Sequence, residues 1–155
     1  MEGGDISNKL ASAVVIDIEG LIYNIEGGKV TSILEKMKGW LSGTKYLDRL
    51  QREVDRYKLV DDNIIGLLEF LIFNYGLYVI LYLNRPNEYY YYVDKLLDDD
   101  FIPYSRLLVG GKTKLERVLK REHIKWYFYT KKENGSTFSK QKERQVENWT
   151  DVGII

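Results

Sequence analysis

The chain has 155 residues, the size of one compact domain, and 45% of them are hydrophobic, which is enough for an ordinary core. It contains no cysteine and a single histidine, His123, which excludes disulfides, thiolate zinc sites and multi-histidine metal cages. No apolar run approaches the roughly 18 residues of a membrane span. The acidic, glycine-rich start (MEGGD) is unlike a signal peptide, so we expect a cytoplasmic protein with no membrane partner.

The net charge is zero, but the charges are unevenly distributed. Between Arg106 and Asp151 there are 12 Lys and Arg residues against 6 Asp and Glu residues. An excess of positive charge in one part of a chain can indicate nucleic-acid or phosphate binding. Two solvated faces of opposite charge are the more common explanation of the same pattern.

The first predicted element is a buried strand. The run Ala13 to Ile18 (AVVIDI) is continuously apolar apart from its aspartate, which is typical of a strand buried on both faces of a parallel sheet. Apolar residues then recur at helical spacing over Val30 to Trp40 and Tyr46 to Tyr57, with Gly43 between them. This pattern predicts a small helical hairpin, which we treat as a cap insertion over residues 24–61 within a single domain (1–155).

Strand and helix alternate along the rest of the chain. Asp62 or Asn63 is positioned to cap an apolar helix that extends through Phe73. The later predictions, in order, are a strand over Leu77–Leu83, a helix over Glu88–Leu97, a weaker strand over Tyr104–Val109, a helix over Thr113–Glu122, a strand over Ile124–Tyr129, a helix over Ser139–Asp151 and a last strand from Gly153.

The alternation predicts an α/β fold, a Rossmann-like parallel five-stranded sheet flanked by helices. The strand that carries Asp17 is expected at its centre. The five strands should run through Val15, Ile80, Leu108, Tyr127 and Ile154.

The functional residues are expected beyond the carboxyl ends of these strands, where open α/β sheets bind ligands. Asp17 interrupts an apolar run, Glu19 follows two residues later, and Gly20 allows the backbone to turn. Two carboxylates at this spacing suit a nucleophile or metal ligand together with an acid/base. A pair of loop acids that cap a neighbouring helix would explain them equally well. The same edge should also hold Asn84, Arg85, the Gly110–Lys112 turn and Thr130.

The segment Val14–Gly20 (VVIDIEG) resembles the first motif of the haloacid dehalogenase (HAD) superfamily, a hydrophobic strand followed by Asp-x-Asp-Gly. The glutamate at position 19 resembles the motif of the enolase-phosphatases, which are members of that superfamily with Glu at the second acidic position. The order of later elements is also similar, with the predicted hairpin where the family has its cap. Lys112 or Lys114 stands where the third motif has its lysine.

The resemblance implies phosphoryl transfer with Mg²⁺. Asp17 would be the nucleophile and a metal ligand, Glu19 the acid/base, and Lys112 the residue that stabilises the aspartyl-phosphate. The second and fourth motifs are degenerate. Asn84 stands where the second motif has Ser or Thr, and lysines follow the fourth strand where the family has metal-binding acids. Glu133 is the first acid after that strand and hence the second candidate metal ligand.

We therefore expect a degenerate HAD-like domain that is non-catalytic or nearly inactive. Its partner would be a phosphorylated small molecule, a nucleic-acid end or another macromolecule. One alternative is a working phosphatase that recruits Glu133 to a weakly held Mg²⁺, and another is a nucleic-acid-binding module that uses the basic C-terminal third. The candidate phosphate-binding residues are Asn84, Arg85, Lys114, Lys131 and Lys132.

Overall fold

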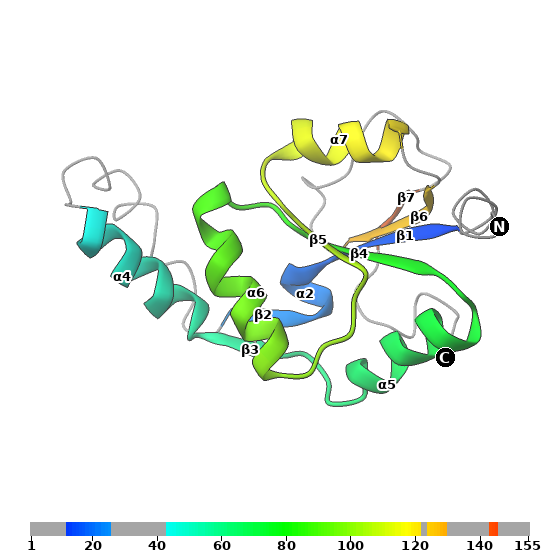
Figure 1. Cartoon of the computed structure of the whole chain (residues 1–155), viewed down its shortest axis with the longest axis horizontal. Helices are drawn as coiled ribbons and strands as arrows, with labels where there is room; N and C mark the ends of the chain where they lie inside the picture. Colours follow the sequence, from blue (N-terminus) through cyan, green and yellow to red (C-terminus); the bar gives the residue numbers. More distant parts are fainter. Residues whose placement is uncertain (1–11, 26–42, 122–123, 130–142, 146–155) are drawn as a thin grey trace, which may run out of the picture.

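The computed structural model describes residues 12–25, 43–121, 124–129 and 143–145. In this part of the chain, a parallel sheet in the order β5-β4-β1-β6-β7 lies between two layers of helices (Figure 1). The α/β fold and the central place of the Asp17 strand are confirmed. The strands of this sheet are β1 (Ala13–Asp17), β4 (Tyr78–Leu83), β5 (Arg106–Val109), β6 (Ile124–Tyr129) and β7 (Glu143–Gln145).

The central strands are apolar because both faces of the sheet are covered. β1 pairs with β4 along its whole length, from Ala13 opposite Tyr78 to Asp17 opposite Tyr82. On its other side it pairs with β6, and all five of its residues are buried. The long apolar run is therefore typical of a strand that has a partner strand on each edge and helices on each face.

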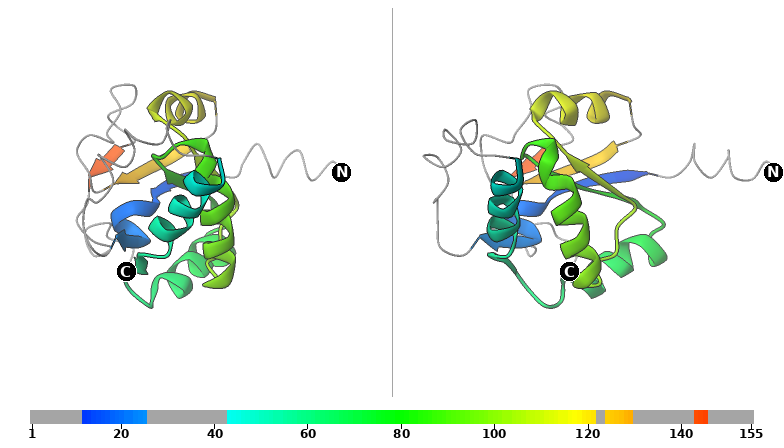
Figure 2. Two further views of the ribbon diagram at one scale, coloured as in Figure 1. Left: turned by 90° about the vertical axis from the view of Figure 1, so that its left-hand side faces the viewer. Right: turned by 60° about the vertical axis from the view of Figure 1, so that its left-hand side comes forward.

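Helix α7 (Lys112–Arg121) covers one face of the sheet, while α5 (Ile64–Glu69) and α6 (Tyr90–Asp99) cover the other (Figures 1 and 2). The core is divided accordingly into two clusters. On the α7 side, Leu115 and Leu119 belong to a cluster with Val15 of β1. The other cluster joins the opposite face of the sheet to α5 and α6.

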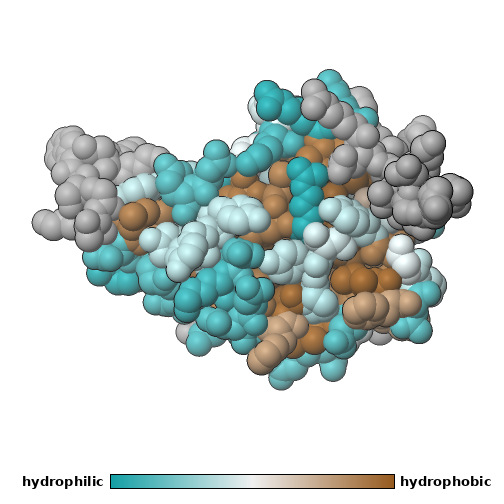
Figure 3. Space-filling model, in the orientation of Figure 1, coloured by the Kyte–Doolittle hydropathy of each residue, from teal (hydrophilic) through white to brown (hydrophobic). Residues whose placement is uncertain are grey.

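Two short irregular helices complete these layers. The π-helical turn η2 (Phe70–Asn74) continues α5, and the 3₁₀ turn η3 (Asn87–Tyr89) leads from β4 into α6. Figure 3 shows mainly hydrophilic surface over α4 and α6, and apolar surface in the lower region where α5 and η2 lie. Phe70 and Phe73 of η2 are exposed. No helix among the described residues is both long and apolar enough to cross a membrane.

The insertion after β1 is partly strand, not wholly helical. After the turn α2 (Ile18–Leu21), strand β2 (Tyr23–Ile25) pairs antiparallel with β3 (Tyr57–Leu59). Between them, α4 (Gly43–Val54) packs beside α6. The helix expected up to Tyr57 thus ends at Val54, because Tyr57 is paired with Ile25 in the two-stranded sheet of β2 and β3. The helix expected over Val30–Trp40 lies outside the described residues.

Two other sequence predictions are corrected by the structure. The helix predicted over Ser139–Asp151 is wrong at Glu143–Gln145, which form the edge strand β7 beside β6. These three polar residues are held by backbone pairing to β6, so the sequence has no apolar pattern that would predict a strand there. The predicted fifth strand at Ile154 lies outside the described residues.

The start of α5 also differs in detail. Asn63 occupies the N-cap position, but neither its side chain nor that of Asp62 makes the expected capping bond. Instead, the Asp61 carboxylate accepts a hydrogen bond from the backbone N–H of Asn63 at 2.9 Å. The helix nevertheless begins within one residue of the predicted start.

Candidate functional site

Asp17 is the last residue of β1, and the sheet buries it almost completely. Its side chain is 1% exposed, and the hydroxyl of Tyr127 on β6 donates a 2.8 Å hydrogen bond to its Oδ1. Tyr82 of β4 lies opposite Asp17 in the register and donates its own hydroxyl to the Gly110 carbonyl. Burial, and then the charge of Asp17, raise the pKa of Tyr82 well above its ordinary value. Asp17 therefore lies between tyrosines on both neighbouring strands.

Glu19 lies in the tight turn that follows β1. The turn depends on Gly20, whose φ of 100° is unfavourable for residues with a Cβ. Arg85, just after β4, donates its Nε to Glu19 Oε2 at 2.8 Å, and the hydroxyl of Tyr57 on β3 donates to the same oxygen at 3.1 Å. Glu19 is 8% exposed, so this ion pair is largely removed from water.

The ionisation of this cluster follows from its burial. Burial raises the pKa of Tyr57 far above its ordinary value, and Glu19 adds to the shift although Arg85 opposes it. Burial by itself would lower the pKa of Arg85, but the charge and the hydrogen bond of Glu19 outweigh it and raise that pKa. Arg85 is thus a permanent cation at the sheet edge, paired with a buried acid.

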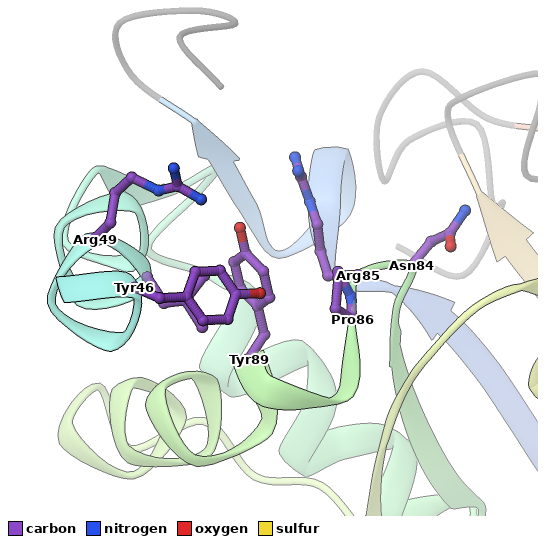
Figure 4. A pocket seen from close by; sticks show the side chains of 7 residues that line it. Tyr46, Arg49, Asn84, Arg85, Pro86 and Tyr89 are labelled. Atoms are coloured by element: carbon purple, nitrogen blue, oxygen red, sulfur yellow. The ribbon is translucent and has the colours of Figure 1, made fainter. Parts of the chain in front are cut away.

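A cavity of about 200 Å³ opens between α4 and the turn that joins β4 to η3 (Figure 4). Arg49 of α4 is buried, with its guanidinium carbon 5.6 Å from the centre of the Tyr46 ring. Arg85 lies 5.8 Å from the ring centre of Tyr89, whose hydroxyl donates to the Glu53 carboxylate. The cavity is lined by Tyr46, Arg49, Leu50, Asn84, Arg85, Pro86 and Tyr89.

The two candidate lysines of α7 are placed differently. Lys112 is the first residue of the helix. Lys114 Nζ lies at the carboxyl end of β5, 2.9 Å from the Val109 carbonyl and 3.2 Å from Asn87 Oδ1. Gly110 allows this approach, because a Cβ there would come within 2.6 Å of Lys114 Cδ. The structure thus gives Lys114 two contacts at the carboxyl end of β5.

The carboxyl edge of the sheet brings together part of the predicted site. Glu19 and Arg85 are in direct contact, and Asn84 lines the adjoining cavity. The sequence did not predict Tyr57 of β3 and Tyr127 of β6 as partners of the two acids, because they lie 38 and 110 residues away along the chain. It also did not predict that Tyr46 and Arg49 of α4 line the adjoining cavity. Thr130, Lys131, Lys132 and Glu133 follow β6 and lie outside the described residues.

Asp17 and Glu19 are the two candidate metal-binding acids that the structure describes, and Glu133 lies outside the described residues. No three Asp, Glu, His or Cys side chains within them lie together as a possible ligand set. Asp17 accepts its hydrogen bond in a buried position, and Glu19 is neutralised by Arg85. Mg²⁺ prefers several carboxylate oxygens and keeps some of its waters, whereas both of these acids are buried and hydrogen-bonded to protein groups.

No known protein family matches this sequence, and no curated protein matches it. Two solved structures resemble its fold over 90% of the chain, each at 16% identity. One, the Pnkp1/Rnl/Hen1 complex, matches with a TM-score of 0.54 over 46% of the matched chain. The other, the Pnkp1/Rnl/Hen1 RNA repair complex, matches with a TM-score of 0.60 over 43% of its chain. The present chain thus spans somewhat less than half of the chains that it matches, and at this identity the likeness shows a shared α/β fold.

Proposed function

We propose that this chain is a HAD-like domain that binds a phosphorylated ligand at the carboxyl end of its sheet and hydrolyses it feebly or not at all. The observation that carries the proposal is the state of the two acids. A nucleophile must reach phosphorus, but Asp17 is 1% exposed and hydrogen-bonded to Tyr127. An acid/base must exchange protons with the substrate, but Glu19 is held in an ion pair with Arg85 and a hydrogen bond with Tyr57.

The binding side of the proposal rests on the cations beside those acids. Arg85 lies at the sheet edge beside Glu19, and Arg49 lines the adjoining cavity; a guanidinium has five donors in a planar fork that suits phosphate oxygens. The amide of Asn84 lies in the same wall, and Lys114 stands at the end of β5. Lys131 and Lys132 follow the strand next to β1, and we expect them to add positive charge at the same edge.

The likeness to chains of an RNA repair complex supports one class of ligand, a phosphorylated nucleic-acid end. The basic C-terminal third favours the same class. A free phosphorylated small molecule would use the same cations.

The proposal is tested by comparing the wild type with Asp17→Asn. The amide keeps an oxygen that can accept from Tyr127, so the variant should fold. We expect feeble turnover of an aryl phosphate by the wild type at every Mg²⁺ concentration, little further loss in the variant, and unchanged affinity for ribose 5-phosphate. As a binding control, Lys131→Glu combined with Lys132→Glu should weaken that affinity.

A Mg²⁺-dependent phosphatase is the second candidate, favoured by the place of Asp17 at the tip of the central strand with Glu19 two residues on. It would recruit Glu133 as a metal ligand. Robust Mg²⁺-dependent turnover that Asp17→Asn abolishes would establish it and overturn the non-catalytic proposal.

A further inference from the structure

We propose that the cavity between α4 and the β4–η3 turn holds the base of a nucleotide, so that the phosphorylated ligand of this domain is a nucleoside phosphate. This inference rests on the proposed function, because it takes the phosphoryl group to lie at the sheet edge beside Arg85. It adds the class of molecule to which that group is attached.

The walls of the cavity are suited to a flat ring. Tyr46 comes from α4 and Tyr89 from η3, so two aromatic side chains from separate elements meet there with Pro86 (Figure 4). Aromatic side chains bind bases by stacking, whichever base is present. Leu50 closes the cavity from α4 and is itself 1% exposed. A ligand in this cavity therefore meets two aromatic rings and apolar atoms, with the Arg49 and Arg85 guanidinium groups beside them.

The rings are held in position before any ligand arrives. Tyr89 is 2% exposed, its hydroxyl donates to Glu53, and Arg85 lies against its ring. Tyr46 is half-buried, and Arg49 lies against it. Tyr46 is thus the more accessible ring, and a preorganised wall loses little conformational entropy when a base stacks on it.

Arg85 connects the cavity to the sheet edge. Its guanidinium bonds Glu19 at the end of β1 and also lies 5.8 Å from the Tyr89 ring. A ligand that reaches both places needs a planar ring at one end and an anionic group at the other, separated by a short spacer. A nucleoside phosphate has this arrangement, since its ribose separates base from phosphate.

The size and chemistry of the cavity disfavour other phosphorylated ligands. Its volume of about 200 Å³ is below the roughly 300 Å³ at which pockets for drug-sized ligands begin, so it fits one ring system. A sugar phosphate has no aromatic ring that could stack on these tyrosines. An acyl chain would gain nothing from two guanidinium groups.

The test compares 5′-AMP with ribose 5-phosphate, which has a hydroxyl group in place of the base, by calorimetric titration of the full chain. We expect AMP to bind at least tenfold more tightly. Tyr46→Leu should abolish the preference, so that AMP and ribose 5-phosphate bind the variant about equally. Tyr46→Phe keeps the ring and should preserve the preference.

Equal binding of AMP and ribose 5-phosphate by the wild type would overturn the base site and leave the proposed phosphate-binding function in place. Binding of neither would overturn the proposed function itself. Because the comparison is made first on the wild type, it stands even if Tyr46→Leu folds poorly. A trinucleotide with a terminal phosphate, tested beside AMP, identifies the source of the nucleotide: tighter binding of the trinucleotide indicates a nucleic-acid end, and equal or weaker binding indicates a free nucleotide.

Discussion

Asp17 and Glu19 are two residues apart, but the turn at Gly20 gives them different surroundings. Asp17 faces the tyrosine of β6, whereas Glu19 meets a cation from the loop after β4. A buried ion pair adds little net stability compared with apolar residues, but removing one partner leaves the other charge buried and uncompensated. The Glu19–Arg85 pair is therefore a place where a single substitution should have a large effect on stability.

We expect Arg85→Met to lower the free energy of unfolding by about 2–3 kcal/mol. Methionine keeps the apolar stem but leaves Glu19 without its cation. The effect should be smaller than for a fully buried pair, because the Arg85 side chain is 22% exposed. Urea denaturation measures the change.

The matched control is Lys95→Met, which breaks the Lys95–Asp99 pair. There the charged atoms are 3.6 Å apart and the side chains are 60% and 64% exposed. Exposed pairs contribute little, so the control should change stability by no more than about 0.5 kcal/mol. Equal losses in the two variants would show that the Glu19–Arg85 pair is not held in a buried setting.

At the scale of elements, the end of α6 shows a conflict between sequence and backbone. The backbone N–H of Ile102 donates to the Leu97 carbonyl at 2.9 Å, which closes the helix with a Schellman-type turn. That turn places Phe101 in the left-handed region with φ of 58°, a position that glycine usually occupies. The Phe101 side chain is 81% exposed, so packing does not compensate for the strain.

We expect Phe101→Gly to stabilise the fold by about 1 kcal/mol, because it removes the Cβ from the left-handed residue. The measurement is the midpoint of urea unfolding at constant slope. Phe101→Ala is the control, since it removes the same ring but keeps the Cβ, and it should be nearly neutral. If glycine destabilises as much as alanine or more, the ring contributes packing that its exposure does not indicate.

The elements also show what the sequence could and could not predict. β1 and β4 were predictable because burial on both faces requires an unbroken apolar run. In the sequence Tyr57 continues the helical spacing of α4, and only the pairing with β2 makes it a strand residue. β7 is stabilised by main-chain bonds at an edge and carries no pattern of its own.

The candidate site, like the fold, could be predicted from the sequence only in part. The rule for the carboxyl ends of parallel strands correctly placed Arg85 near Glu19, 66 residues away in sequence. It could not show that the two are bonded, that Tyr127 buries Asp17, or that α4 brings Arg49 and Tyr46 to the same edge. Those facts depend on packing between distant segments, for which a single sequence has no local signal.

At the scale of the whole molecule, tyrosines are unusually numerous, 13 in 155 residues, and several join elements across the fold. Tyr57 bonds β3 to the turn after β1, and Tyr23 donates to Asp100 at the end of α6 at 2.6 Å. Burial raises the pKa of both far above the ordinary value, and Glu19 and Asp100 respectively add to the shift. Folding and tyrosine ionisation are therefore coupled.

The coupling predicts alkaline unfolding. Below the ordinary tyrosine pKa of 10.0, both states are protonated and these groups give no pH dependence. Above it, the unfolded chain loses protons that the folded chain retains, so the free energy of unfolding falls, by at most about 1.4 kcal/mol per pH unit for each such group. Urea unfolding at successive pH values measures this slope, and Tyr23→Phe should make it shallower above pH 10. Tyr91→Phe, at a residue 67% exposed, is the control and should leave the slope unchanged. A slope that Tyr23→Phe leaves unaltered would mean that Tyr23 ionises equally in both states, which its burial and its bond to Asp100 argue against.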